Sequence, residues 1–426
     1  MKKKTKELNS TFHPYLKKDK LWFIFAIAKN LSKSYDFKLY NNLLYAKFDD
    51  EYITNTDDII SRINLDVDMT KAQYKELLYQ LKFYSEKINY QINKIKLNNG
   101  ILTLTENGYE VIEDDGSFCP YRLDVNYDID ANDEHVLKFM NDISCKNKDI
   151  YNMLVELIGC VLITEPKCQY MFFIHGNKGR NGKSTFTSML RKFLGEELTS
   201  NISILGLKDE TKLSKLNGKL LNICDDADYE KIYLERSQML KSLASGELIN
   251  CRAIYSYPIE FYNTATIVCT SNNVPEFSDK SGGMRRRLII IEFNKTITKE
   301  TNNPNLIEEI STPYAKSTIL NLAIKGMNSL LKNNYYITEN DTLNKSLEEY
   351  YKNTDTVKDF IESGATIDNT PVPQVYEAYT TFCDTVICKE KESKNVFGMR
   401  LKQYGYISKP SNSKQSGMVR IYKKVT

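Results

Sequence analysis

The sequence predicts an α/β protein whose central domain contains a largely parallel sheet. Between about residues 163 and 293, short apolar runs alternate with segments of helical spacing, the pattern of strands joined by helices. Three of these runs end in residues suited to phosphate chemistry: a glycine-rich loop, a pair of aspartates and an asparagine. With 426 residues, the chain is long enough for two or three domains with separate cores. We expect a mainly helical region with a short β segment at 1–145, the α/β domain at 146–335 and a small domain at 345–426.

The bulk composition says more about the cellular compartment of the protein than about the molecules it binds. The 58 basic and 55 acidic residues give a net charge of +3, so the global charge argues neither for nor against nucleic acid. The nine cysteines include no Cys-x-x-Cys pair, which predicts free thiols in a reducing, cytoplasmic setting. The three histidines, His13, His135 and His175, lack a second ligand at metal spacing, so no zinc site is expected. No 18-residue apolar run occurs, and no apolar stretch follows the basic start, so we expect neither a membrane span nor a signal peptide.

The spacing of apolar residues changes within the first 112 residues, from a helical pattern to short runs separated by turns. Residues 1–20 carry seven lysines against two acidic residues, which predicts a solvated arm that could touch nucleic acid. From 21 to about 95 the apolar spacing is mostly helical. Between Ile95 and Ile112 short apolar runs are separated by the turn sequences Asn98-Asn99-Gly100 and Asn107-Gly108, so short strands are expected there.

The stretch Tyr170–Phe186 predicts a phosphate-binding loop. A helical segment at 135–163 runs into the apolar run Met171–Ile174, which is short enough for one buried strand; glycines follow, and then a helical pattern begins. Backbone N–H groups of such a loop close on phosphate oxygens, its lysine reaches the β and γ phosphates, and its serine hydroxyl ligates Mg²⁺. The expected contacts are Gly179, Arg180, Asn181, Gly182, Lys183, Ser184 and Thr185.

The loop departs from the strict pattern in one respect. Five residues separate Gly176 from Gly182, where the pattern has four. Because Gly179 to Ser184 is regular, we expect the extra residue to bulge at the strand end. The alternative interpretation of the stretch is a glycine-rich turn before a surface helix, which the strand before it and the helix after it disfavour.

Two later apolar runs end in residues able to complete such a site. Lys219–Cys224 is followed by Asp225-Asp226, where the first carboxylate can hold Mg²⁺ through water and the second can orient or deprotonate the attacking water. Thr266–Ser271 is followed by Asn272, an amide able to bond the γ-phosphate or that water. Such sequences are also ordinary turns, so their weight comes from their order along the chain.

Three arginines, Arg285, Arg286 and Arg287, precede the apolar run Leu288–Ile291. One interpretation is a solvated basic face. Guanidinium groups are also what a neighbouring subunit would present to a γ-phosphate in trans, where they act on the charge of the transition state.

The order of these motifs resembles that of superfamily III helicases, and more narrowly the phage and plasmid primase-helicase family, which includes poxvirus members. Leu216–Leu221 is similar to that family's leucine–x–glycine–lysine approach to its acidic strand, and Ile95–Leu102 to a strand-turn that precedes its ATPase. The resemblance covers residues 90–295 best. It implies a P-loop AAA+-type ATPase core that uses ATP and Mg²⁺, assembles as a homo-hexameric ring and moves on single-stranded DNA. The resemblance assigns Lys183 to phosphate and Ser184 to Mg²⁺, and it makes Asp225 and Asp226 the acidic pair, with Asp225 nearer the metal. It makes Asn272 the sensor amide. The trans-acting arginine falls on Arg286 or Arg287, and we favour Arg286.

The resemblance also implies a DNA-gripping hairpin between the acidic strand and the sensor strand. That segment is 249–261 here, and its tip carries Tyr255-Ser256-Tyr257 where relatives often have a lysine or histidine. We expect Arg252 to contact phosphate and Tyr255 to stack on a base or sugar, with Ser256 beside it. A hairpin whose aromatic side chains simply pack is the alternative.

Three helical segments and a hairpin pattern predict a winged-helix domain at 345–426. One helix starts at Val357, a second covers 373–385, and Ser393 can cap the third, before a hairpin at 406–422. Residues 389–426 hold eight lysines and two arginines against two glutamates, a net charge of +8, as in a duplex-binding module; the alternative is a solubilising tail. The expected DNA contacts are Lys394, Arg400 and Lys402 on the third helix and Lys409, Lys414 and Arg420 in the hairpin.

The motifs and the resemblance together predict an ATP-dependent DNA helicase and replication initiator of a mobile genetic element. It would bind duplex origin DNA through 345–426, translocate on single-stranded DNA as a ring, and work with a host or element-encoded primase or polymerase. Two rivals are left open: an origin-binding initiator whose ATP site only drives assembly, and an ATPase that remodels protein without translocating. The paired carboxylates favour hydrolysis over binding alone.

Overall fold

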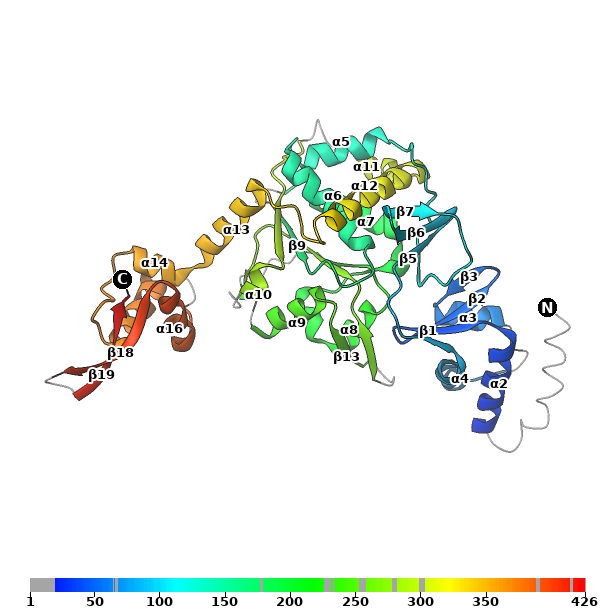
Figure 1. The fold of residues 1–426 in the computed structure, drawn as a ribbon, viewed down its shortest axis with the longest axis horizontal. Coiled ribbons are helices and arrows are strands. Elements are labelled where there is room, and N and C mark those ends of the chain that lie inside the picture. Colours follow the sequence, from blue (N-terminus) through cyan, green and yellow to red (C-terminus); the bar gives the residue numbers. More distant parts are fainter. Residues whose placement is uncertain are drawn as a thin grey trace. The chain divides into compact units, whose positions relative to one another are not determined.

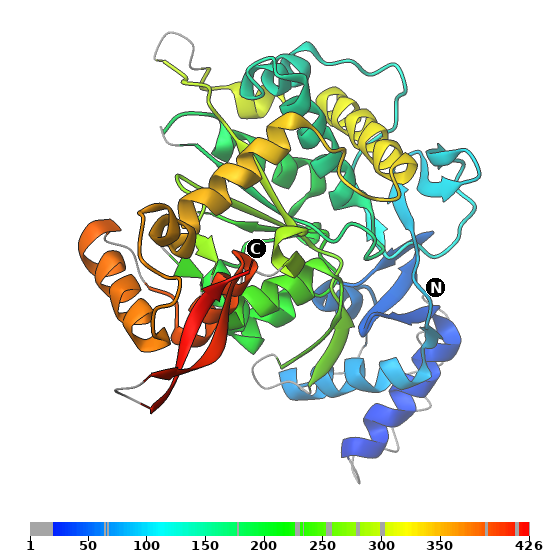
Figure 2. The same cartoon turned by 60° about the vertical axis from the view of Figure 1, so that its left-hand side comes forward.

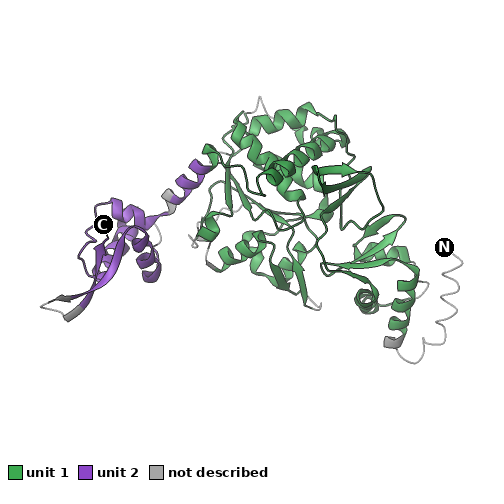
Figure 3. Ribbon diagram, viewed as in Figure 1, with its two compact units in different colours: residues 1–343 green, residues 344–426 purple. Residues whose placement is uncertain are grey.

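The computed structural model describes residues 20–63, 65, 68–176, 179–225, 231–232, 234–252, 258–277, 282–298, 303–387, 391–413 and 417–425. The chain forms two compact units, residues 1–343 (unit 1) and 344–426 (unit 2), coloured separately in Figure 3. Among the described residues, no helix has both the length and the apolar character needed to cross a membrane. The fold is a mixture of helices and strands around a parallel sheet, as the alternating pattern predicts.

The N-terminal part of unit 1 contains a sheet that the helical spacing did not predict. Its four strands lie in the order β3-β2-β1-β4, and apolar side chains of α2, α3 and α4 pack with it into one core. The prediction of a mostly helical stretch from 21 to 95 was therefore wrong between Phe37 and Ile53 and again at Glu86–Ile88. The missed signal is Asn41-Asn42: both have positive φ, 49° and 63°, as in the two-residue turn that joins hairpin strands. The elements are α2 (Lys20–Ser34), β1 (Phe37–Tyr40), β2 (Leu43–Phe48), β3 (Glu51–Ile53), α3 (Thr56–Ile63), α4 (Lys71–Tyr84) and β4 (Glu86–Ile88).

A second small sheet follows, in the order β7-β6-β5-β8. The strands predicted between Ile95 and Ile112 are confirmed, with turns at the two asparagine-glycine sequences. Asn328 of a later helix bonds both the N–H and the carbonyl of Tyr109, at 2.7 and 2.9 Å, and so ties this sheet to the central domain. The strands are β5 (Lys94–Leu97), β6 (Gly100–Thr105), β7 (Gly108–Ile112) and β8 (Tyr121–Arg122).

The central sheet of unit 1 has five parallel strands in the order β10-β11-β15-β9-β17. Nearly every strand residue is buried, as expected for a parallel sheet covered on both faces. The three apolar runs predicted to precede the glycine loop, the aspartates and Asn272 are the neighbouring strands β9, β11 and β15. The strands are β9 (Met171–His175), β10 (Thr199–Ser200), β11 (Leu221–Cys224), β15 (Thr266–Ser271) and β17 (Leu288–Glu292), with a separate short pair, β12 (Lys231–Ile232) and β16 (Glu276–Phe277).

Helices α6 and α12 pack at a separation that only glycine permits. A Cβ on Gly159 of α6 would lie 2.5 Å from the Met327 nitrogen, and one on Gly326 of α12 would overlap the carbonyl of Val155. Figures 1 and 2 show this helix pair on one side of unit 1 and α9 on the other. The helices of this part are α5 (Glu134–Ile143), α6 (Lys148–Leu162), α7 (Lys183–Leu194), α8 (Glu210–Leu213), α9 (Leu234–Ala244), α10 (Gly282–Arg285), α11 (Leu306–Glu309) and α12 (Pro313–Lys332).

A hairpin of β13 (Leu248–Cys251) and β14 (Ile259–Tyr262) lies between α9 and β15 along the chain. The amide of Asn41, in the β1–β2 turn, donates to the Tyr262 carbonyl at 2.9 Å and accepts from the Tyr262 N–H at 2.7 Å. This pair of bonds continues the hydrogen-bonding edge of β14, so the N-terminal sheet holds the base of the hairpin in place.

Unit 2 has its own aromatic core. Phe360, Tyr379, Phe397 and Tyr422 are buried together, and the Tyr379 and Phe397 rings stack with centroids 4.3 Å apart. The predicted helices and hairpin are confirmed, and Ser393 caps the third helix by accepting from the Val396 N–H. The elements are α13 (Asp341–Thr354), which begins in unit 1, α14 (Thr356–Glu362), α15 (Val372–Phe382), α16 (Lys394–Gln403), β18 (Tyr406–Ser413) and β19 (Gly417–Lys424).

Candidate nucleotide-binding site

The glycine-rich loop lies at the point where the order of the central sheet reverses. After β9 the chain passes through α7 to β10 at the far edge, returns through β11 and β15, and then crosses β9 to form β17 on its other side. In open sheets of parallel strands, ligands bind at the carboxyl ends of the strands beside such a switch point. The loop from Gly176 to Gly182 therefore occupies the position where a bound ligand is expected.

The base of the loop is packed tightly against the chain that leaves β17. The Asn181 side chain is 3% exposed, and its Nδ2 donates to the Phe293 carbonyl at 3.2 Å. A Cβ on Gly176 would overlap that Nδ2 and lie 2.5 Å from the Phe293 oxygen. Asn181, predicted as a nucleotide contact, thus braces the loop with its side chain. The predicted bulge falls at 177–178, outside the described residues.

The start of α7 requires glycine at position 182. Gly182 is the N-cap of the helix, with φ of 92°, and a Cβ there would lie 2.7 Å from the Ile143 Cγ2. Because the N-cap residue is a glycine, it offers no side-chain acceptor of its own to the first N–H groups of the helix. Ser184 is exposed and Thr185 is half-buried in the first turn, while Gly179 and Arg180 are exposed in the loop.

Lys183 and Asn272 are brought together although they are 89 residues apart. The Lys183 ammonium donates to the Gly176 carbonyl at 3.1 Å and lies 3.5 Å from the Asn272 Oδ1. Asn272 is exposed at the end of β15, next to β9 in the sheet. The Lys183 side chain therefore lies between the end of β9, where the glycine-rich loop begins, and the end of β15, where Asn272 follows.

Asp225 lies one strand further along the same edge. Its Oδ1 accepts from the Thr270 hydroxyl at 3.4 Å, and its Oδ2 lies 3.6 Å from the Arg191 Nη2. Sequence reasoning missed Arg191, which belongs to α7. Its signal was the spacing from Ser184: seven residues are nearly two helical turns, so both lie on one side of the helix. Asp226 lies outside the described residues.

Three further polar residues meet at the carboxyl ends of β15, β9 and β17. The strand register pairs Ser271 with His175 and His175 with Glu292. Burial lowers the pKa of His175; nearby Glu292 opposes this shift and Lys183 adds to it. The Ser271 hydroxyl is buried and has no hydrogen-bond partner within the described protein. A buried hydroxyl without a partner is costly, so this oxygen marks a place for an added polar group or water.

The three arginines have different surroundings. The Arg287 side chain is 8% exposed and donates to the Ser245 hydroxyl at 3.0 and 2.6 Å and to the Gly283 carbonyl at 2.8 Å. Burial, followed by the charge of Arg286, lowers the pKa of Arg287. Arg285 and Arg286 are exposed.

The predicted DNA contacts are spread over both units. Arg252 is exposed at the end of β13, and Tyr255 and Ser256 lie outside the described residues. In unit 2, Lys394, Lys402 and Lys409 are exposed, and Lys414 lies outside the described residues. The Arg420 guanidinium is exposed and bonds the hydroxyl and carbonyl of Ser408.

Arg400 is the exception among these basic residues. Its Nη2 lies 2.6 Å from the Asp355 Oδ2, and the two side chains are only 15% and 7% exposed. The Tyr404 hydroxyl donates to the same carboxylate oxygen. Burial alone would raise the pKa of Asp355, but Tyr404 and Arg400 outweigh it and the pKa is lowered. The Arg400 guanidinium is therefore paired with a buried carboxylate of unit 2 instead of facing solvent.

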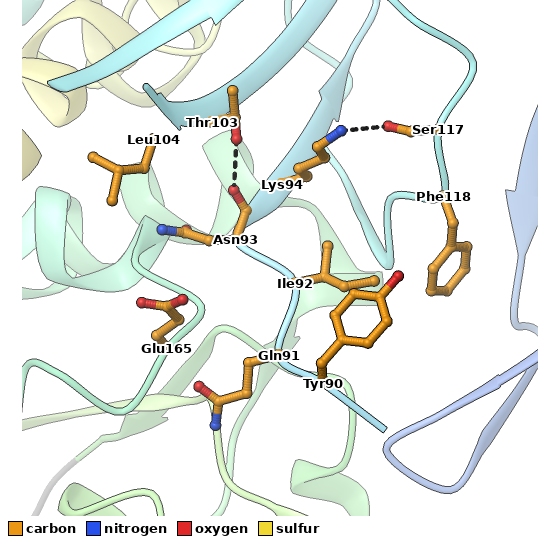
Figure 4. Close-up of a pocket in the computed structure, with 10 residues that line it drawn as sticks. All are labelled: Tyr90, Gln91, Ile92, Asn93, Lys94, Thr103, Leu104, Ser117, Phe118 and Glu165. Atoms are coloured by element: carbon orange, nitrogen blue, oxygen red, sulfur yellow. Dashed lines mark hydrogen bonds between the residues drawn. The ribbon is translucent and has the colours of Figure 1, made fainter. Parts of the chain in front are cut away.

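A pocket of about 360 Å³ lies apart from the phosphate loop, between the 90–93 segment, β5, β6 and Glu165 (Figure 4). Some of its polar groups are bonded to other lining residues or to residues nearby. Lys94 contacts Ser117 at 2.7 Å and Asp115 at 3.2 Å, and Glu165 pairs with Lys167. We assign no ligand to this pocket.

The loop and its surroundings fit the phosphates of a nucleotide. The N–H groups at the start of α7, the Lys183 ammonium and the Ser271 hydroxyl, which has no partner among the described residues, would each bind phosphate oxygens or their waters. Ser184 and Asp225 supply the oxygen ligands that Mg²⁺ prefers.

Comparison with known proteins gives distant similarities. Residues 174–287 match a family of unknown function, DUF5906. The chain is 24% identical over 239 residues to the putative helicase V13 of Sputnik virophage, covering 49% of this chain and 31% of that protein. It is 24% identical over 297 residues to primase D5 of fowlpox virus, covering 66% of this chain and 33% of that protein. The solved C-terminal region of NrS-1 aligns with 95% of this chain and 99% of its own, at 13% identity and a TM-score of 0.49. The chain spans about a third of the length of these two curated relatives, and it is distantly similar in sequence to viral helicase and primase proteins.

Proposed function

We propose that this chain is the ATP-dependent motor of a DNA helicase that initiates replication of a mobile genetic element. The observation that carries the proposal is that Lys183 at the start of α7, Asn272 after β15 and Asp225 after β11 lie at the carboxyl ends of the neighbouring parallel strands β9, β15 and β11. These residues come from three separated segments, and their types are those of a nucleotide-hydrolysing site. The fold class proposed is the AAA+-type core of superfamily III helicases.

The comparisons support a role in DNA replication. One relative is named a putative helicase and the other a primase, and the segment that matches the family model, residues 174–287, includes the glycine-rich loop. Because only about a third of each relative is covered, unwinding and the element it serves are part of the proposal. A primase or polymerase would come from the host or from the same element.

ATP would supply a γ-phosphoryl group whose transfer to water releases free energy. The N–H groups at the start of α7 and the Lys183 ammonium would bind its phosphates, and Ser184 with Asp225 would hold Mg²⁺. Asn272 would orient the water from the neighbouring strand, and Asp226 would accept its proton. Burial lowers the pKa of His175 and so favours its neutral form, which adds no second positive charge beside Lys183.

Assembly as a homo-hexameric ring would complete the site. We propose Arg286 as the group that reaches the γ-phosphate of the neighbouring subunit, since it is exposed whereas Arg287 is bonded to Ser245. The hairpin carrying Arg252, Tyr255 and Ser256 would grip single-stranded DNA within the ring. Unit 2, as a winged-helix domain, would bind duplex origin DNA through α16 and the β18–β19 hairpin.

Strand displacement on a forked duplex tests the proposal. We expect unwinding by the wild type, and loss of both ATPase and unwinding in Lys183→Ala and Asp226→Asn, each by at least about 100-fold. Lys192→Ala is the matched control, because this lysine is exposed on the same helix, away from the loop. It should keep both activities.

The same experiment separates the rival functions. A wild type that hydrolyses ATP and unwinds no fork, with or without origin DNA, would contradict the helicase. If ATP then drives only assembly on origin DNA, the chain is an initiator without motor activity. Hydrolysis that is indifferent to DNA would instead favour a protein-remodelling ATPase.

A further inference from the structure

We infer that the exposed face of helix α4 in the N-terminal part of unit 1 binds single-stranded nucleic acid. The helix is firmly built into the fold. Thr70 and Gln73 form a capping box at its start, and Leu77 and Leu81 are buried in the core shared with α2. The opposite face is therefore held rigidly toward solvent.

That face carries lysines and aromatic rings in one row. Lys71, Lys75, Tyr79 and Phe83 follow one another at four-residue spacing, which places them along one side of a helix in a row about 18 Å long. Lys71 and Lys75 are exposed, and Phe83 is 60% exposed. The Tyr79 and Phe83 rings touch edge to face, with centroids 5.2 Å apart.

The row has a positive charge because the other charged groups of α4 are engaged elsewhere. The helix contains one acidic residue, Glu76, whose carboxylate accepts from the Gln80 amide at 2.6 Å. The third lysine, Lys82, donates to the Asn42 carbonyl at 2.7 Å on the side facing the β1–β2 turn. Lys71, Lys75 and Phe83 are exposed on this face, the half-buried Tyr79 ring lies beside Phe83, and Tyr84 is 40% exposed at the end of the helix.

This combination fits a single strand better than other partners. Lysines bind phosphates, and aromatic faces accept unpaired bases whatever their sequence. A duplex would offer phosphates but no exposed base faces to the rings. A protein partner that covered Phe83 would have to leave two lysine charges at the edge of an apolar contact, which is unfavourable without acidic residues.

The helix packed beside α4 repeats the pattern. On α2, Phe25 is 37% exposed, and Lys29 and Lys33 are exposed at the next two four-residue steps. The sequence leading into α2, residues 1–20, contains seven lysines. Two adjacent helices thus carry the same ligand chemistry, separate from the phosphate loop and the β13–β14 hairpin. The inference rests on the proposed function only for the choice of DNA over RNA.

The test measures binding of a fluorescent oligo(dT) to the full-length protein without nucleotide. We expect Lys75→Ala/Phe83→Ala to weaken binding by about 10- to 100-fold and to lower the salt dependence by about 0.7 in slope. The matched control is Lys332→Ala/Tyr336→Ala, which removes an exposed lysine and an aromatic residue, 67% exposed, near the end of α12. It should bind as the wild type does. Lys71→Glu/Lys75→Glu removes no packing, and should also weaken binding.

Photo-crosslinking locates the site directly. An oligonucleotide carrying 5-iodouracil should give adducts on Tyr79 or Phe83 in the wild type. Unchanged affinity in both α4 variants, with adducts only elsewhere, would overturn the inference. So would a variant that keeps its affinity but changes the oligomeric state by sedimentation, because the face would then be a contact between copies.

The two proposals fail separately. A protein that crosslinks through α4 but neither hydrolyses ATP nor unwinds a fork would contradict the helicase and leave the α4 site. A protein that unwinds forks equally well with and without the α4 substitutions, and binds oligo(dT) unchanged, would contradict the α4 site alone.

Discussion

Neighbouring arginines differ in what they can do, because one side chain is bonded inside the fold and the next is exposed. The Arg287 guanidinium holds the start of β17 to the end of α9 through Ser245. Arg286, the adjacent residue, is exposed. A trans-acting group must reach another subunit, which a buried and fully engaged guanidinium cannot do without breaking its own contacts.

We therefore expect opposite outcomes from two single substitutions. Arg287→Ala should lower the free energy of unfolding by about 1–3 kcal/mol, because the Ser245 and Gly283 groups lose their partner. Arg286→Ala should leave the melting temperature unchanged and reduce the ATPase of the assembled protein by about 1,000-fold. Thermal melts and ATPase assays at assembly concentration measure both. Full ATPase activity in both variants would refute the arginine assignment.

His175 should make the stability of unit 1 sensitive to mild acid. Its pKa is lowered from 6.5 by burial, so below pH 6.5 the unfolded chain binds a proton that the folded chain resists. Stability is then lost as the pH falls from the unfolded pKa toward the folded one, and it is unaffected above it. We expect the melting temperature of the wild type to fall more than that of His175→Gln between about pH 7.5 and about pH 5.5. Parallel curves for the two proteins would contradict this.

At the scale of elements, α16 combines a core face and a solvent face. Phe397 and Leu401 are buried, Arg400 pairs with Asp355 at the cap of α14, and Lys394 and Lys402 are exposed. The basic residues of this helix thus divide into one that holds the unit together and two that are available to a ligand.

Substitutions on α16 should separate these roles. Arg400→Ala should destabilise unit 2 by about 3 kcal/mol, since it leaves the buried Asp355 carboxylate without its charge partner. Lys402→Ala should not change stability, but should weaken duplex binding and reduce its salt slope by about 0.9. Chemical denaturation and binding titrations at several salt concentrations give both quantities. A Lys402→Ala protein with unaltered duplex affinity would exclude this face of α16 from DNA contact.

At the scale of the molecule, the two units have separate cores. Deleting residues 345–426 should leave the ATPase within about twofold of the intact protein and abolish sequence-specific duplex binding, since the excess positive charge is concentrated in the deleted part. Origin-fragment binding and ATPase assays on the same preparation decide the question. Survival of specific binding would assign origin recognition to unit 1.

Prediction from the sequence succeeded where the signal was local and failed where it depended on partners. The strands β9, β11, β15 and β17 and the Ser393 cap follow from short apolar runs and single residue types. The β1–β2 hairpin was missed because mixed spacing around Asn41-Asn42 suits a helix nearly as well. In the candidate site, Lys183 and Asn272 were predicted from their motifs and lie 3.5 Å apart, whereas Arg191 and the Ser271–His175 pair have no motif of their own.

The sequence by itself determined the location of the glycine-rich loop, the order of the strands that follow it and the basic character of residues 389–426, because these depend on residue type and short-range spacing. Only the tertiary structure decided which charged side chains are bonded to other residues inside the protein. Arg287 bonds a serine 42 residues away and Arg400 an aspartate 45 residues away. It also decided that the lysines and rings of α4 share an exposed row. The spacing of apolar residues predicts which face of a helix is buried. It does not predict which polar side chains on the other faces find a partner, because that depends on how distant segments pack.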